Sequence, residues 1–142
     1  MVVYELTHIF YRDPDGLVYS PKHLGLYFSY ESVQQAVQYY CTQPGFCEAQ
    51  DAFSIRERKV SGNIIGNTVF EVLVYLHSAN YEFETEVELG IYDDEVTAYN
   101  KLNKYCGDNV PLVTAQDLIV EKIVNKRIIE KREWAEGFSL SD

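Results

Sequence analysis

Residues 81–106, YEFETEVELGIYDDEVTAYNKLNKYC, decide the fold because they join an alternating strand pattern to a helical pattern. Glutamate occupies every second position from Glu82 to Glu88, and Leu89-Gly90-Ile91-Tyr92 follows. Since residues two apart share one face of a strand, the sequence predicts an acidic row opposite an inward face of Phe83, Thr85, Val87 and Leu89. From about Asp94 onward, helical spacing links Ala98, Leu102, Tyr105 and Cys106.

The helical half of this stretch has an earlier counterpart. Leu24-Gly25-Leu26-Tyr27 opens a segment that Tyr40-Cys41 closes, and it aligns without a gap with the segment from Leu89 to Cys106. Ser29 is the expected N-cap of the first helix, whose apolar stripe comprises Val33, Ala36, Val37, Tyr40 and Cys41. A tandem duplication accounts for this match, and a recurring strand-to-helix junction is the alternative explanation.

Strand patterns flank both helical segments. Alternating or β-branched residues predict strands at 2–11, 23–28 and 52–60 in the first copy, and at 69–77, 81–92 and 118–124 in the second. We therefore expect an α+β protein of two β-β-α-β copies, residues 1–62 and 67–142, that share one core. The expected architecture is an antiparallel sheet with both helices packed on one side, the copies being related by a pseudo-twofold axis.

Composition limits the class of protein. The 142 residues are 46% hydrophobic and 14% aromatic, which is typical of a packed globular chain. A formal net charge of −10 opposes binding to nucleic acid or anionic membranes and favours a basic partner. There is no long apolar run and no signal-like N-terminus, and the three cysteines form no disulfide framework, so a reducing cytoplasm is expected.

No catalytic motif is present. The three histidines, His8, His23 and His77, lack the spacing of a metal-binding pair, and Cys41 with Cys47 lacks a second chelating pair. Neither a metal site nor a cofactor site is predicted. Because a nucleophile and its base need be adjacent only in space, a small hydrolase or transferase that uses carboxylates or Cys/His residues stays open as an alternative.

Several short signals carry a resemblance. Gly25-Leu26-Tyr27-Phe28-Ser29, Pro44-Gly45-Phe46 and Trp134-Ala135-Glu136-Gly137-Phe138 resemble the signals of an uncharacterised family of small bacterial α+β domains. The pattern is split here, since the Trp motif occurs only after the second copy. More loosely, a compact acidic chain of this size is similar to bacterial toxin-immunity proteins, which implies protein binding rather than catalysis.

We therefore predict a non-enzymatic protein-binding module, an immunity or inhibitor protein that neutralises a basic bacterial toxin, such as a nuclease, through an acidic face. The predicted contact residues are Glu82, Glu84, Glu86, Glu88, Asp93, Asp94 and Tyr99. A row of this kind is also, and more often, the solvated or charge-protected face of a strand, and both roles are compatible. The cationic segment 122–132 is expected to complement the row within the chain. A homodimer, or a self-associating structural protein, is the third alternative.

Overall fold

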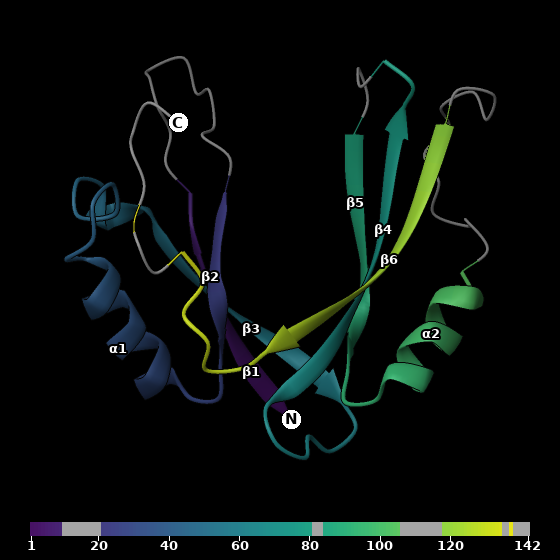
Figure 1. Cartoon of the computed structure of the whole chain (residues 1–142), viewed down its shortest axis with the longest axis horizontal. Coiled ribbons are helices and arrows are strands. Elements are labelled where there is room, and N and C mark those ends of the chain that lie inside the picture. The colour runs from purple at the N-terminus through teal and green to yellow at the C-terminus, as the bar shows by residue number, and fades with distance from the viewer. Residues whose placement is uncertain (10–20, 81–83, 106–117, 135–136, 138–142) are drawn as a thin grey trace. The chain divides into compact units, whose positions relative to one another are not determined.

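A computed structural model describes residues 1–9, 21–80, 84–105, 118–134 and 137. Two helices and six strands follow one another along the chain (Figure 1): β1 (Val2–His8), β2 (Lys22–Tyr27), α1 (Tyr30–Tyr40), β3 (Phe53–Ser61), β4 (Thr68–Ser78), β5 (Glu84–Tyr92), α2 (Glu95–Asn103) and β6 (Leu118–Ile128). A short 3-10 helix, η1 (Gln50–Ala52), precedes β3. The predicted α+β class is confirmed, and the order β-β-α-β occurs twice.

The chain divides into two compact units, each described here by itself. The N-terminal unit comprises Val2–Arg58 and Ile128–Asp142, and the central unit comprises Lys59–Arg127 together with Met1. The boundaries fall inside β3 and at the end of β6. Each of these two strands therefore begins in one unit and ends in the other. The predicted copies, 1–62 and 67–142, each contain their strands whole.

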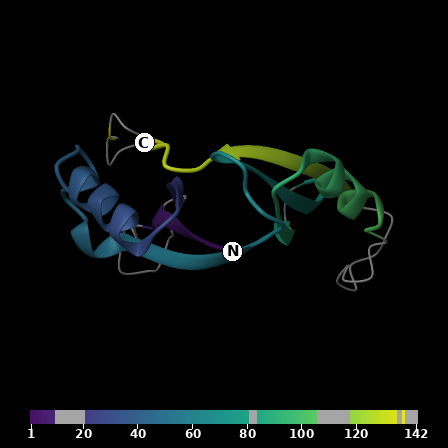
Figure 2. The ribbon, with the colours of Figure 1, turned by 90° about the horizontal axis from the view of Figure 1, so that it is seen from below.

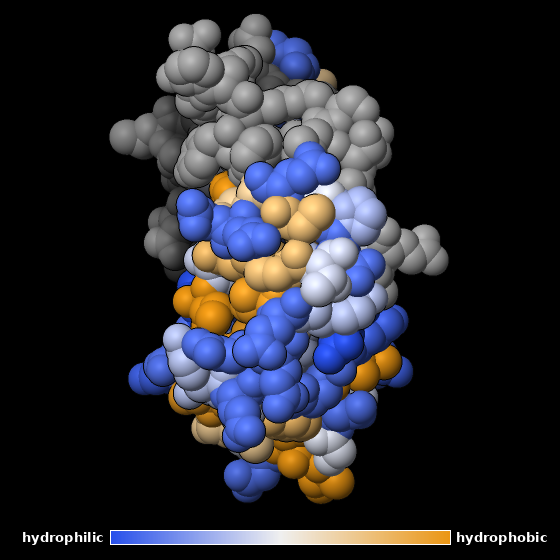
Figure 3. Space-filling model, turned by 90° about the vertical axis from the view of Figure 1, so that its left-hand side faces the viewer, coloured by the Kyte–Doolittle hydropathy of each residue, from blue (hydrophilic) through white to orange (hydrophobic). Residues whose placement is uncertain are grey.

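In the N-terminal unit, β1 and β2 pair antiparallel, as expected. The Ser29 hydroxyl accepts the Ser32 backbone N–H and begins α1, as predicted. Val33, Ala36 and Tyr40 of the predicted stripe are buried. They pack with the buried residues Leu6, Leu24, Tyr27 and Phe46. Figure 3 views the molecule from the α1 side and shows hydrophilic side chains over much of that face, with smaller apolar areas between them.

The segment after β6 completes the N-terminal unit. Ile129 forms a parallel bridge with Leu26, and the Glu130 backbone N–H donates to the Leu26 carbonyl at 2.8 Å. The Glu130 carboxylate accepts the Phe28 backbone N–H at 3.1 Å and the Ser32 hydroxyl at 2.6 Å. A negative charge at the start of α1 is favourable because backbone N–H groups are exposed there. Residues that follow the last strand of the second copy thus stabilise the first helix.

Trp134 and Gly137, the two described residues of the Trp motif, contact the N-terminal unit. A Cβ at Gly137 would stand 2.6 Å from the Pro44 carbonyl oxygen, so the backbones of the two segments are in close contact. The Lys22 ammonium lies 5.1 Å from the Trp134 ring, and Arg132 lies 4.4 Å from the Tyr39 ring. The structure therefore brings together Pro44 and Gly137, which the sequence separates.

The central unit contains β4, β5, β6 and α2. β4 pairs antiparallel with β5 from Phe70 to His77. α2 runs from Glu95 to Asn103 with Asp94 as its N-cap, in agreement with the predicted start at about Asp94. Its buried residues Ala98 and Leu102 pack with three side chains of β4, Val72, Val74 and Leu76. The helix ends before Tyr105, which the predicted stripe included, and the predicted stripe residue Cys106 lies outside the described residues.

The prediction of an entirely antiparallel sheet is wrong. The last residues of β3 pair with β5 in parallel, Val60 with Ile91 and Ser61 with Tyr92. The hydrogen-bonded order is β2-β1-β3-β5-β4-β6, which is a mixed sheet. β3 is a single strand that begins in the N-terminal unit and ends in the central unit. Its last residues belong to the central unit, where they pair with β5.

The same local geometry precedes both helices. Gly25 and Gly90 have φ angles of +123° and +136°, a region that favours glycine. Tyr27 and Tyr92 each donate to the carbonyl three residues earlier, at 2.8 and 3.3 Å respectively. In both strands the β ladder is irregular at this point. Glycine lets the tyrosine ring fold back over the strand, which explains the recurrence of Leu-Gly-aliphatic-Tyr.

The remaining sequence predictions differ from the structure mainly at element ends. β6 continues to Ile128, beyond the predicted end at residue 124, and β1 ends at His8 rather than at residue 11. Within the described ranges, no helix is both long enough and apolar enough to cross a membrane.

Candidate functional site

The acidic row is confirmed for the part of it that the structure describes. Glu84, Glu86 and Glu88 are exposed on β5 and are separated by half-buried residues. Val87 and Leu89, on the alternate positions, pack into the cluster beneath α2. The three glutamates therefore lie on the face of the central unit opposite α2. Glu82 lies outside the described residues.

Side chains of β4 lie next to the acidic row. Glu84, Glu86 and Glu88 are register partners of His77, Tyr75 and Leu73, respectively. Tyr75 and Leu73 are half-buried, whereas His77 is buried. The Tyr75 ring stacks on the His77 ring with centroids 5.0 Å apart. Carboxylates, an aromatic ring and an aliphatic side chain thus occupy neighbouring positions on one face.

Two side-chain contacts place β6 beside β4. Arg127 Nη1 lies 3.7 Å from Glu71 Oε1, and His77 Nε2 lies 3.5 Å from Glu121 Oε1. Glu121 and Arg127 are as far apart on β6 as Glu71 and His77 are on β4. The later residue of β6 contacts the earlier residue of β4, so the two strands are antiparallel. Glu121, whose side chain is 54% exposed, therefore shares the face of the acidic row. Arg127, from the predicted cationic complement, pairs with buried Glu71.

The other predicted contact residues have different surroundings. The Asp93 carboxylate accepts the Asn63 backbone N–H at 3.0 Å and packs against Gly62. The Asp94 carboxylate caps α2, and its hydrogen bonds from Thr97 lower the pKa of Asp94. Tyr99 is exposed on α2, whose buried residues pack on the opposite face of the sheet from the glutamates. The structure does not place Tyr99 beside the row.

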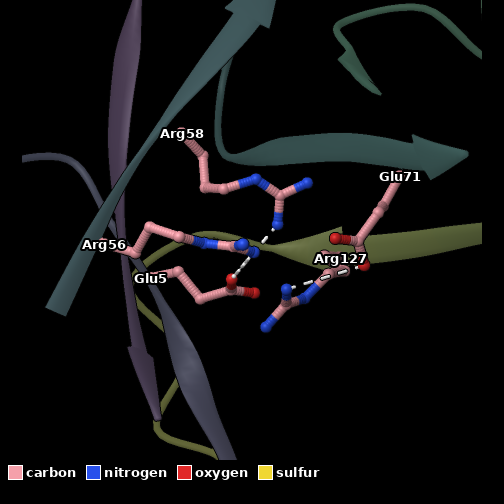
Figure 4. A network of polar contacts seen from close by, with 5 residues as sticks. All are labelled: Glu5, Arg56, Arg58, Glu71 and Arg127. Atoms are coloured by element: carbon pink, nitrogen blue, oxygen red, sulfur yellow. Dashed lines mark hydrogen bonds and ion pairs between the residues drawn. The ribbon is translucent and has the colours of Figure 1, made fainter. Parts of the chain in front are cut away.

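Buried ion pairs are the feature that the sequence analysis missed. Figure 4 shows them in two groups. Glu5 Oε1 accepts Arg56 at 2.8 Å and Arg58 at 3.1 Å, and Glu5 and Arg58 are both buried. The available signal was an acid inside an apolar strand in both copies, Tyr4-Glu5-Leu6 and Phe70-Glu71-Val72. Carboxylates at such positions need a cation because burying an unpaired charge is costly.

His8 is buried between aromatic rings. Its ring lies 4.9 Å from the rings of both Phe46 and Phe53, and Nε2 is 2.9 Å from the Ala49 carbonyl oxygen. Burial lowers the pKa of His8, the hydrogen bond to Ala49 opposes this effect, and the charge of Lys22 adds to it. His8 is therefore a core residue whose neutral form is favoured by folding.

This burial predicts a pH dependence of stability. Below the ordinary pKa of 6.5, the unfolded chain binds a proton at His8 that the folded chain binds only at lower pH. The free energy of unfolding should therefore fall as the pH drops from 6.5 toward the pKa of folded His8. Urea unfolding between pH 5 and 8 should show a smaller decrease for His8→Gln than for the wild type. The same substitution at exposed His23 is the control, and an equal change in both variants would contradict the assignment to His8.

The described residues include two cysteines and a pocket that bear on the alternative of an enzyme. Cys41 and Cys47 are free thiols, and no group of three or more His, Cys, Asp or Glu side chains among these residues could hold a metal ion. A shallow pocket of about 570 Å³ adjoins η1 in the N-terminal unit. It is lined by Ile9, Glu48, Ala49, Gln50, Asp51, Ala52, Phe53 and Ser54. Neither His77 nor Glu121, the histidine–carboxylate pair, lines it.

Comparison of this chain with protein-family models, with curated proteins and with solved structures finds no match. The class that the fold and the surface define is thus an α+β chain with an exposed acidic strand face.

Proposed function

We propose that this chain is a non-enzymatic protein-binding module that engages a basic protein through the face of the central unit opposite α2. The observation that carries the proposal is the position of Glu84, Glu86 and Glu88, which are exposed together on one face of β5. An inhibitor or immunity protein directed against a basic toxin, such as a nuclease domain, is the functional class that this surface fits best.

The composition of the face supports binding to a protein. Half-buried Tyr75 and Leu73 lie beside the glutamates, and Ile123 of β6, which is 40% exposed, shares their face because it is two residues from Glu121. Protein interfaces combine aromatic and aliphatic contacts with a polar rim. The chain therefore presents apolar area for affinity next to carboxylates that can orient a partner.

The charge of the chain supports a basic partner. The net charge of −10 attracts a cationic protein during diffusion, and carboxylates on one face give that attraction a direction. Glu121 adds a further exposed carboxylate on β6, across β4 from Glu84. Association should accordingly be fast at low ionic strength and should weaken as salt screens the charges.

Charge reversal tests the proposal. The double variant Glu84→Lys/Glu86→Lys should bind a basic nuclease toxin domain at least about tenfold more weakly than the wild type, because like charges then face each other. It should also show a smaller salt dependence in isothermal titration. Glu48→Lys/Glu57→Lys, at two exposed positions of the N-terminal unit, makes the same change in net charge and is the matched control. Equal affinity of the two double variants would rule out the acidic face as the docking site.

We also propose that the two β-β-α-β segments arose by tandem duplication. Support comes from the repeated order of elements and from the paired geometry at Gly25 and Gly90. Duplication would explain the scaffold, whereas the glutamates of β5 have no counterpart in β2, whose sequence is KHLGLY.

A further inference from the structure

The two sides of β5 have different strand partners. On one side, β4 pairs with it from Glu84 to Tyr92. On the other side, β3 pairs with it only at Ile91 and Tyr92. Within the described part of the chain, the backbone edge of residues 84–87 therefore has a strand partner only in β4. The side chains along this edge are exposed at Glu84 and Glu86 and half-buried at Thr85 and Val87.

The chain itself shows that this kind of edge accepts an extended segment. At the end of β5, Val60 and Ser61 add in parallel beside Ile91 and Tyr92. At the corresponding place in β2, Ile129 adds in parallel beside Leu26. Both additions occur at the Leu-Gly-aliphatic-Tyr strand that precedes a helix. The edge of residues 84–87 lies on the same side of β5 as the edge that pairs with Val60 and Ser61, nearer the start of the strand.

We infer that the partner binds by strand addition, placing an extended segment with basic residues at every second position along the edge of β5 at residues 84–87. Main-chain N–H and C=O groups of the incoming segment would pair with those of β5, as in other complexes that extend a sheet. This inference rests on the proposed function and specifies how the partner is recognised.

Charge complementarity indicates which kind of peptide segment would bind along this edge of β5. Side chains on one face of a strand recur every ~6.5–7 Å, so basic side chains two residues apart match the spacing of Glu84 and Glu86. The intervening residues would lie beside Thr85 and Val87, on the face that packs against α2. Apolar or β-branched residues suit those positions. A segment in which lysine or arginine alternates with valine or threonine therefore fits the edge.

Peptide binding provides the test. The probe is a short synthetic peptide in which lysine and valine alternate, added to the full-length ¹⁵N-labelled protein. We expect amide chemical-shift changes and slower hydrogen exchange along β5. A second peptide has the same sequence, but alternate backbone amides are methylated. It keeps every charge and lacks the backbone N–H donors at the methylated positions. It should bind at least about tenfold more weakly, because several backbone hydrogen bonds are lost.

The other results separate strand addition from charge docking. If both peptides bind equally and Glu84→Lys/Glu86→Lys weakens both, the acidic face binds cations without strand addition, and only this inference fails. If neither peptide binds while the toxin domain still depends on Glu84 and Glu86, strand addition is likewise wrong and the proposed function stands. If sedimentation instead shows a dimer whose β5 amides are protected in the absence of peptide, the edge is occupied by a second copy, which also overturns the inference.

Discussion

Replacing Glu5 with glutamine should lower the free energy of unfolding by about 3 kcal/mol, because it removes a negative charge that pairs with buried Arg58. The Glu5 side chain is only 4% exposed and that of Arg58 only 9%, so water cannot replace the lost partner. Arg56, at 53% exposure, contributes less because solvent screens its charge. Urea unfolding monitored by circular dichroism measures the change.

Two further variants decide whether the charge itself is responsible. Glu57→Gln removes a carboxylate from an exposed position of β3 between the two arginines and should change stability by less than about 0.5 kcal/mol. The combined variant Glu5→Leu/Arg58→Leu should recover most of the loss, because a buried ion pair can be replaced by apolar side chains. If that double variant were less stable than Glu5→Gln alone, the explanation by an uncompensated charge would be incorrect.

Replacing Gly25 with alanine should cost about 3 kcal/mol and should loosen the C-terminal segment. The φ angle of +123° disfavours any side chain, and a Cβ would stand 2.5 Å from the Lys131 carbonyl oxygen. Because Lys131 adjoins Glu130, which accepts hydrogen bonds at the start of α1, displacement of this segment should also weaken the helix. Fluorescence of Trp134, the single tryptophan of the chain, should shift to longer wavelength.

Gly66 provides the matched control. It also has a positive φ, +86°, but a Cβ there would have no neighbouring atom within 4 Å. Gly66→Ala should therefore show only the backbone cost, about 1 kcal/mol, with unchanged Trp134 fluorescence. Equal destabilisation by the two variants would mean that contact with the C-terminal segment contributes nothing at Gly25.

Different residues contribute to the stability of this protein and to its proposed binding. On β4, Glu71 forms a buried ion pair with Arg127, whereas Tyr75 and Leu73 lie next to the exposed glutamates of β5. Charge reversal at Glu84 and Glu86 should consequently alter binding with little effect on folding. Substitutions at Glu5 or Gly25 should instead act through folding of the N-terminal unit.

Local sequence determined the elements of this fold. Alternation predicted the exposed row from Glu84 to Glu88, because the side-chain period of a strand is two. Capping chemistry predicted the helix start at Ser29, and helical spacing predicted the start near Asp94; both side chains accept backbone N–H groups of the first turn. These features depend on neighbours within a few residues, so they can be read from sequence.

Only the tertiary structure decided which distant residues meet. The parallel pair of Val60 with Ile91, the bridge of Ile129 with Leu26 and the buried pairs of Glu5 and Glu71 join residues far apart in the chain. The hydrophobic pattern of a strand does not indicate whether its neighbour is parallel or antiparallel. It also does not indicate which arginine pairs with a buried carboxylate. Those choices are made when the strands come together, because burial then makes each unpaired charge or backbone group costly.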